Sequence, residues 1–390
     1  MKRFFLLLSF LCPLLLAQSF DIAILEAMKR NSKIKALEQE IEKLENDSLV
    51  ASKWENPTLS IGYNTLYLTN PSYRDDAMQS ISISLSQKID IAGKKNLESQ
   101  KISLKKQIKI LELKALKKNI IKELKIRAIR SYQDQKRIEI LKSILDNILL
   151  FKNQINASSS DFPLDGIYKM EILETKIKLR IDQYRENQKT QMIEFNEITF
   201  QGDQELGTQP TFEKNWNGEY YKRSYEFLIQ KYKEDIENEN ISLAKRSFLS
   251  DPTLSVGYFH RKKQQDFISL GVSFSLPIYG KEYFMLQSAY KQSQIVQNAT
   301  LETQNRIQAK IKKLLNTLEQ KQIELSLIEN NLLPNTKKLL LLYQNNISTS
   351  KSAMGAYHQA LNDLLDAELL RIEVSGSVLI AMAELESIGE

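Results

Sequence analysis

Four short stretches of the chain alternate apolar and small polar residues with a period of two, a pattern that predicts β-strands. They form two pairs, and each pair predicts a hairpin, the first over about residues 58–90 and the second over about residues 253–278. One face of each stretch carries Leu, Ile, Val, Tyr or Phe, and the other face is serine or glycine nearly throughout. We therefore expect strands of about ten residues with one apolar face and one face of small side chains.

The rest of the chain has the apolar spacing of long helices and contains few helix breakers. Residues 94–156 contain neither glycine nor proline, so they predict a helix that would reach roughly 95 Å at about 1.5 Å per residue. Residues 281–334 place apolar residues in a 3-4 alternation, which predicts a coiled-coil seam that packs on other helices. Shorter helices are predicted at 21–53, 165–200, 224–250 and 355–388.

An internal repeat organises these elements. The phrase NPTLSIGY at residues 56–63 returns as DPTLSVGY at residues 251–258, and half of the 390-residue chain separates the two copies. Each half reads as helix, hairpin, long helix, turn and helix, so residues 20–200 and 224–390 are two structural repeats. Residues 201–223 hold three of the glycines and one of the prolines, and are predicted to connect the repeats. The predicted strand–helix junction residues are Pro57, Gly62, Gly93, Pro252, Gly257, Pro277 and Gly280.

Residues 1–19 have the composition of a secretory signal peptide. A positive start precedes an apolar run, and small residues allow cleavage after Ala17 or Ser19. The one cysteine of the chain, Cys12, lies inside this segment, so the mature chain is expected to have neither disulfides nor thiolate chemistry. After this segment no run of 18 apolar residues follows, and no transmembrane helix is predicted.

Charge and composition exclude several classes of function. The net charge of +6 is small for 390 residues, so nucleic acid is not an expected partner. The two histidines, His260 and His358, are too few for a histidine metal cluster, and no nucleophile–base pair or phosphate-binding glycine loop is recognisable. We therefore expect no enzyme activity and no cofactor. Residues 94–130 hold 13 basic and 3 acidic residues, which predicts a solvated helix face or an electrostatic surface for an acidic partner or a duct wall.

Two structures fit the predicted strands: an ordinary half-buried sheet packed on the helices, and part of an outer-membrane barrel. A soluble sheet usually carries Lys, Glu and Thr on its wet face, so the serine and glycine face favours the barrel. Four strands cannot close on themselves, and an open edge cannot lie in lipid, because its N–H and C=O groups would be unsatisfied. Identical chains would then share one barrel. Two copies would make a narrow barrel filled by side chains, and three would leave room for a pore.

With these motifs the chain resembles the TolC-like outer-membrane efflux protein family over essentially the whole mature sequence. The similar segments are the repeated Pro-Thr-Leu-Ser phrase at each first strand, IDIAGKK at residues 89–95, LPIYGKE at residues 276–282, and ALNDLLDAELL at residues 360–370. No single motif is specific to the family. Their order, their duplication and the matching lengths carry the resemblance.

The resemblance implies a mainly α fold with a β-barrel part. Long antiparallel helices would form a coiled-coil tube in the periplasm, and a homotrimer with four transmembrane β-strands per chain would complete a 12-stranded barrel in the outer membrane of a Gram-negative bacterium. Such a trimer is a passive exit duct that works with a periplasmic adapter (membrane fusion) protein and an inner-membrane transporter. The resemblance therefore implies a function in tripartite efflux of small toxic compounds or ions. The alternatives are type I protein secretion through the same fold, or a non-channel periplasmic coiled-coil structural protein.

The resemblance also places the periplasmic tip at two turns, about residues 156–168 and 347–357. The tip and gate candidates are Ser158, Ser159, Asp161, Ser350, Gly355, Ala356, Tyr357, His358 and Gln359. Some family members carry a ring of aspartates just after the second tip. Here those positions fall near Ala356 and Gln359, so an acidic ring is not predicted for this chain.

Overall fold

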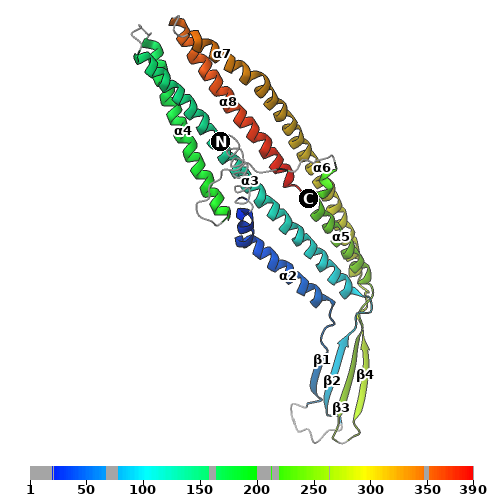
Figure 1. Ribbon diagram of the computed structural model, residues 1–390. Coiled ribbons are helices and arrows are strands. Elements are labelled where there is room, and N and C mark those ends of the chain that lie inside the picture. Colours follow the sequence, from blue (N-terminus) through cyan, green and yellow to red (C-terminus); the bar gives the residue numbers. More distant parts are fainter. Residues whose placement is uncertain are drawn as a thin grey trace, which may run out of the picture. The chain divides into compact units, whose positions relative to one another are not determined.

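The computed structural model describes most of the chain, namely residues 20, 22–66, 78–157, 164–199, 212, 219–262, 264–346 and 351–389. The predicted signal peptide and most of the predicted connection between the repeats lie outside the described residues. So do four of the tip candidates: Ser158, Ser159, Asp161 and Ser350. The described residues are mainly helical and include a small antiparallel sheet, which confirms the predicted balance of secondary structure (Figure 1).

The chain divides into two compact units that do not coincide with the two sequence repeats. The first unit combines Met1–Lys35, Leu113–Tyr225 and Asn305–Glu390. The second unit combines Ala36–Glu112 and Glu226–Gln304. Each unit therefore takes segments from both halves of the sequence.

The second unit contains the sheet. Its strands, within the described residues, are β1 (Thr58–Asn64), β2 (Ser80–Lys88), β3 (Thr253–His260) and β4 (Phe267–Ser273). They have 7 to 9 residues, fewer than the ten that alternation predicts. For β3 and β4 the reason is local: β3 begins directly after Pro252, which has no N–H to extend the ladder. The apolar alternation of β4 therefore continues through Phe274 and Leu276 after regular pairing has ended.

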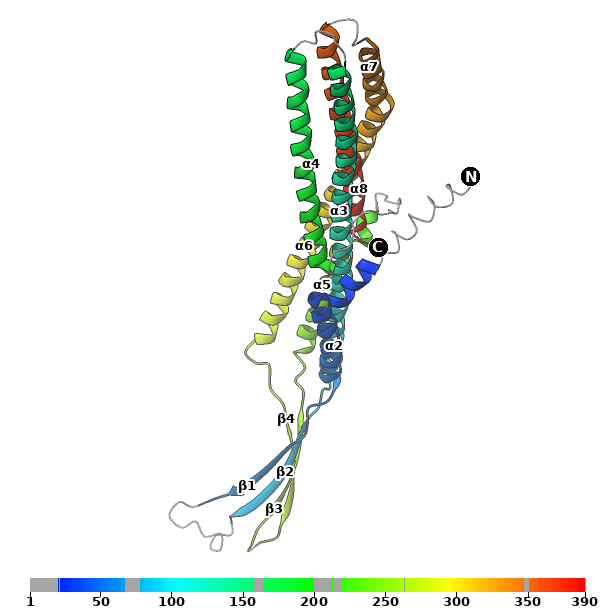
Figure 2. The same ribbon diagram turned by 60° about the vertical axis from the view of Figure 1, so that its left-hand side comes forward.

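The two hairpins join into a single antiparallel sheet in the order β1-β2-β3-β4 (Figures 1 and 2). The joint is the pairing of β2 with β3, in which Ile83 faces Tyr258 and Leu85 faces Val256. Alternation predicts each hairpin but not this joint, because it pairs strands from opposite halves of the chain.

The helices of the second unit flank the sheet in sequence. They are the larger part of α2 (Ser32–Ser52), the start of α3 (Lys94–Ala157), nearly all of α5 (Tyr225–Arg246) and the start of α6 (Lys281–Leu327). The single helix predicted over 21–53 is interrupted at Asn31. Its side-chain Oδ1 accepts hydrogen bonds from the backbone N–H groups of Lys33 (2.9 Å) and Ile34 (3.2 Å), so Asn31 caps the N-terminus of α2.

The first unit is a helical bundle. It contains the remainder of α3 and α6, together with α4 (Leu164–Thr199), the 3₁₀ turn Tyr220–Arg223, the π-turn Ile328–Leu332, α7 (Leu333–Asn346) and α8 (Lys351–Glu386). The helix predicted to end at Pro334 continues through it to Asn346. Proline is tolerated near the start of a helix, and the π-turn just before α7 changes the hydrogen-bond pattern at that point.

Two of the apolar clusters that hold this bundle together involve α3. Leu141, Ile177 and Leu361 are almost completely buried in a cluster formed by α3, α4 and α8. A second cluster around Leu124 and Phe195 lies further toward the start of α3. Along α3 the two are separated by three buried polar residues, Ser131, Gln133 and Asp134.

Candidate functional site

The sheet has one continuous apolar face. The register aligns apolar residues across all four strands, in the rows Leu59–Leu85–Val256–Leu270 and Ile61–Ile83–Tyr258–Ile268. These side chains are exposed, and Leu270 and Ile61 retain 80% and 72% of their surface. A contiguous exposed apolar surface of this kind marks a contact with lipid or with another protein.

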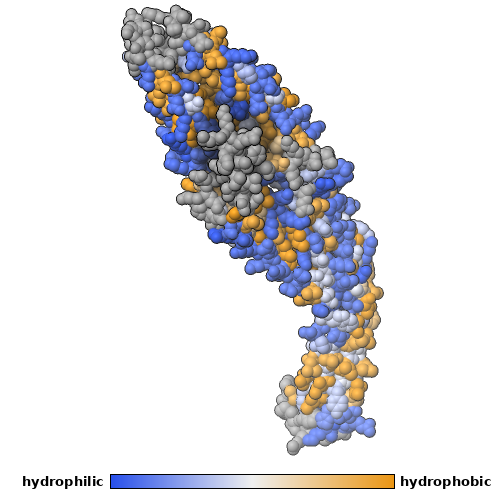
Figure 3. Space-filling model, in the orientation of Figure 1, coloured by the Kyte–Doolittle hydropathy of each residue, from blue (hydrophilic) through white to orange (hydrophobic). Residues whose placement is uncertain are grey.

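The opposite face is built from small residues in the same register. Its rows are Thr58–Ser86–Ser255–Gly271 and Ser60–Ser84–Gly257–Ser269. Strongly hydrophilic residues instead gather at the turn of the β3–β4 hairpin, as the surface in Figure 3 shows. The sheet thus has an apolar face, a weakly polar face and a charged end.

The sheet is open. β1 pairs only with β2, and β4 pairs only with β3, among the residues that the structure describes. The outer edges of β1 and β4 therefore carry backbone groups that pair with no described strand, and such edges favour the addition of another strand.

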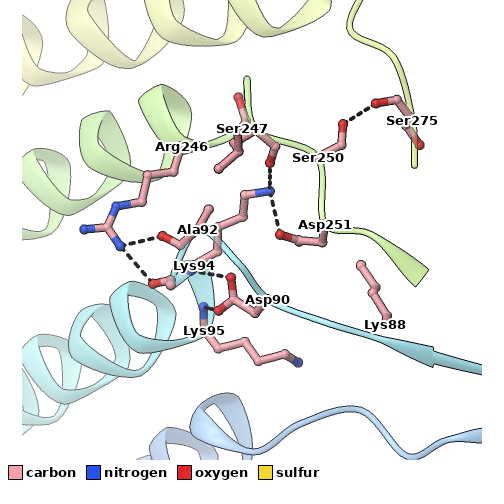
Figure 4. Close-up of polar contacts among 12 residues, drawn as sticks. Lys88, Asp90, Ala92, Lys94, Lys95, Arg246, Ser247, Ser250, Asp251 and Ser275 are labelled. Carbon is pink, nitrogen blue, oxygen red and sulfur yellow. Dashed lines mark hydrogen bonds and ion pairs between the residues drawn. The ribbon is translucent and has the colours of Figure 1, made fainter. Parts of the chain in front are cut away.

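A cluster of polar contacts joins the strands to the helices within the second unit (Figure 4). Nζ of Lys94, the first residue of α3, donates to the carbonyl oxygen of Leu249 at 2.6 Å and lies 3.2 Å from Oδ1 of Asp251. The backbone N–H of Ile89 donates to the carbonyl oxygen of Pro252 at 2.9 Å. These contacts tie the end of the first hairpin to the start of the second.

Asp90 caps the N-terminus of α3. Its two carboxylate oxygens accept hydrogen bonds from the backbone N–H groups of Lys94 (2.9 Å) and Lys95 (2.8 Å). Burial alone would raise the pKa of Asp90, but these backbone donors outweigh it and hold the pKa below its usual value. The carboxylate is therefore charged at the positive end of the helix dipole, where it stabilises the helix.

Both halves turn from strand to helix through a glycine in the left-handed region, Gly93 at φ +66° and Gly280 at φ +71°. At Gly93 a side chain would meet a second obstacle, because a β-carbon there would lie 2.9 Å from Nη1 of Arg246. That nitrogen donates to the carbonyl oxygens of Ala92 (2.7 Å) and Gly93 (3.1 Å). Conformation and contact together explain the glycine at this turn.

The remaining junction candidates lie at or beside the strands. Pro57 and Pro252 precede β1 and β3, Gly62 and Gly257 lie inside these strands, and Pro277 follows β4. Pro277 occupies the position in the second half that Asp90 occupies in the first. The start of α6 therefore lacks the carboxylate cap of α3.

The described tip candidates lie inside α8, which begins at Lys351, four residues before the start that the sequence predicts. Tyr357 is buried in the cluster with Leu361, and burial raises the pKa of its hydroxyl. Gln359 donates to Asp363 at 2.8 Å, whereas Gly355 is exposed and Ala356 half-buried. Helix α8 is therefore already regular at these positions.

His358 lies beside basic residues of α4. Burial lowers the pKa of its imidazole, and the positive charges of Lys169 and Lys176 lower it further. Nδ2 of Asn362 donates to the His358 carbonyl oxygen at 3.0 Å. His358 is therefore biased toward its neutral form at physiological pH.

Intrachain pairs neutralise much of the basic stretch of α3. Lys106 lies 3.2 Å from Glu45 of α2, and Lys125 lies 2.6 Å from Glu386 of α8. Other pairs that connect this stretch to other segments are Lys94–Asp251, Lys95–Glu55, Lys109–Glu40 and Arg127–Glu194. These pairs favour packing of α3 on its neighbours over a surface for an acidic partner.

Sequence reasoning missed three features. Arg246 and Asp251 give no local signal of their contacts with α3, which lie far away in the sequence. Asp134 lies among other polar residues, so the sequence does not distinguish it from a solvated side chain, yet it is buried beside Arg137 at 2.8 Å, and burial raises its pKa despite that partner. The third is an aromatic pair, Phe259 and Phe267, which breaks the rule of small residues on its face.

Two negative findings apply to the described part of the chain. No group of three or more His, Cys, Asp or Glu side chains there could hold a metal ion. None of its helices has both the length and the hydropathy needed to cross a bilayer.

An open, two-faced sheet of four described strands continues into helices of up to 64 residues. No family model matches the sequence, and no curated protein matches it. Solved structures do match.

The chain is similar to the MtrE outer membrane channel of Neisseria gonorrhoeae in its open state, with 15% identity, a TM-score of 0.72, and coverage of 93% of this chain and 88% of that one. It is similar to the CmeC outer membrane channel of Campylobacter jejuni, with 12% identity, a TM-score of 0.71, and coverage of 95% and 86%. It is also similar to the outer membrane protein VceC of Vibrio cholerae, with 12% identity, a TM-score of 0.70, and coverage of 94% and 96%. The chain has the TolC-like fold that its sequence predicted.

Proposed function

We propose that three copies of this chain form a passive exit duct of a tripartite efflux pump, through the outer membrane of a Gram-negative bacterium and into the periplasm. The observation that carries the proposal is the open sheet with one apolar and one small-residue face. The likeness to solved outer membrane channels supports it.

Closure of the sheet requires other copies. Unpaired backbone groups are unfavourable in lipid, so β1 of one copy pairs with β4 of the next. Three copies give twelve strands, and at about 4.8 Å between strands and about 40° of tilt the barrel would be roughly 24 Å across between backbones. That width leaves an aqueous lumen.

The two faces then have separate roles. The apolar face, which carries Ile61, Ile83 and Leu270, meets the lipid. The serine and glycine face lines the lumen, where short side chains leave the path wide. The charged turn of the β3–β4 hairpin lies at the outer end.

The helices form the periplasmic tube, and the helix ends near Tyr357 form its closed tip. Burial of Tyr357 and Leu361 against α3 and α4 supports this role for the tip. A periplasmic adapter protein and an inner-membrane transporter complete the pump, and contact with them separates the packed helix ends. In this proposal the chain catalyses no reaction. The duct carries small toxic compounds or ions.

Planar-bilayer conductance of the purified protein tests the proposed function. We expect small or rare openings for the wild type, and larger or more frequent openings for Tyr357→Ala/Leu361→Ala, because these changes remove buried packing at the tip. Leu370→Ala is the control, since Leu370 is a partly exposed leucine of the same helix. Protein that never conducts in any of the three forms would contradict the proposal.

A further inference from the structure

One pair of residues interrupts the small-residue face of the sheet. Phe259 of β3 and Phe267 of β4 are the only aromatic residues on that face among the described strand positions. They lie opposite each other, with ring centroids 4.6 Å apart and ring planes inclined by 3°. In the same row the first hairpin has Gly62 and Ser82, so only the second hairpin has large side chains in this row.

A guanidinium group extends this pair. Cζ of Arg261 lies 4.9 Å from the ring centroid of Phe267. Nε and Nη2 of Arg261 donate to the carbonyl oxygen of Gln265 at 3.1 and 2.7 Å, and Nη1 donates to Oε1 of Gln264 at 2.8 Å. The loop therefore holds the positive charge over the aromatic ring.

Asp266 keeps the loop in this form. Its carboxylate accepts hydrogen bonds from the Tyr258 hydroxyl, from the backbone N–H of Arg261 at 2.9 Å and from His260. The Tyr258 hydrogen bond, followed by that of Arg261, lowers the pKa of Asp266 to about 2. The carboxylate is thus charged at any physiological pH. It therefore keeps its hydrogen bonds to the loop across that range.

Gly257, two residues before Phe259 in β3, contributes to the same arrangement. A β-carbon at Gly257 would lie 3.0 Å from Cε2 of Phe259, so the ring lies over a position where a side chain would have to push it away. The small-residue face therefore leaves space for the aromatic pair as well as for the lumen.

We propose that Phe259, Phe267 and Arg261, here called the aromatic stack, form a contact site for aromatic anions on the luminal wall near the mouth of the duct. This inference rests on the proposed function, in which three copies of the stack face one lumen. Flat aromatic solutes pack favourably against phenyl rings. The loop sequence HRKKQQD holds three basic residues and one acidic residue, a composition that favours negatively charged solutes.

Block of the single-channel current by 2-naphthalenesulfonate tests the site. We expect this aromatic anion to reduce the wild-type current, and we expect the midpoint of block to rise about tenfold in Phe259→Ser/Phe267→Ser. Arg261→Gln is expected to weaken block by the anion and to leave block by a naphthyl ammonium cation no weaker. Phe274→Ser is the matched control, because Phe274 is exposed and belongs to the apolar face.

A second measurement does not require a conducting channel. The mature chain is expected to contain no cysteine, so Ser82→Cys, at the position opposite Phe259 on the same face of the sheet, gives a unique thiol for a water-soluble maleimide and leaves the aromatic stack intact. Naphthalenesulfonate should slow this labelling, and cyclohexanesulfonate should do so less. Unchanged block in the double serine variant, or labelling that the aromatic anion does not slow, would overturn the contact site. A non-conducting particle would count against the duct itself, and the labelling would still decide the site.

Discussion

Arginine at Ile83 is expected to prevent assembly in the outer membrane, whereas arginine at the next residue, Ser84, is expected to permit it. The two positions are neighbours in the central strand β2, so they share strand propensity and backbone pairing. They differ in the face that they occupy. Ile83 continues an apolar row across all four strands, and Ser84 belongs to the serine and glycine row.

The expected size of this effect follows from the cost of charge in lipid. A lipid-facing arginine near the middle of a barrel strand costs about 2–4 kcal/mol, and a trimer carries the substitution three times. In the proposed duct Ser84→Arg places the same charge in the aqueous lumen, and we expect it to reduce conductance without loss of the protein. Outer-membrane fractionation and heat-dependent gel migration measure assembly. Equal assembly of both variants, or equal failure, would contradict the assignment of the faces.

Truncation of Ile177 to alanine is expected to lower the free energy of unfolding of the helical bundle by about 2–5 kcal/mol. Its side chain is completely buried among α3, α4 and α8, so its removal loses apolar contacts and leaves a cavity. Leu179, two residues further along α4, is 65% exposed, and Leu179→Ala is expected to change stability by less than about 0.5 kcal/mol. Urea denaturation followed by circular dichroism measures both.

The matched comparison makes this second prediction specific. If Leu179→Ala cost as much as Ile177→Ala, the face of α4 that packs on α8 would be misassigned. If neither substitution lowered the free energy of unfolding, the cluster would not hold the bundle together.

The sequence predicted the elements whose signal is local. Alternation in Leu59 to Tyr63 and in Ile268 to Val272 identifies strands and their faces, because side chains two residues apart share a face of a sheet. The long helices follow in the same way from 3.6-residue spacing without breakers. Both signals are complete within about ten residues of chain.

The features that the sequence did not predict depend on distant partners or on backbone alternatives. The joint between β2 and β3 brings together opposite halves of the chain. Asn31 interrupts one helix because its side chain caps the next turn, and Pro334 fails to end another because a π-turn precedes it. Local propensity does not distinguish these outcomes from their alternatives.

The features of the candidate site also differ in whether a local sequence signal predicts them. Glycine at residue 93 was recognisable as a turn, since few residues adopt a positive φ. Its contact with Arg246, and the pairing of Lys94 with Asp251, depend on tertiary structure. The family resemblance implies a tip at two turns, and this stays a prediction; the part of α8 that the structure describes shows Tyr357 packed rather than solvated.

The mass of the purified particle tests the central claim most directly. Light scattering that separates protein from bound detergent should give a protein mass near three times that of the mature chain, which is slightly below the 45.1 kDa of the full sequence. Copies that add β1 to β4 around one axis predict this value. A stable, membrane-derived particle with the mass of one chain would contradict it, because β1 and β4 would then have no strand of another copy to pair with.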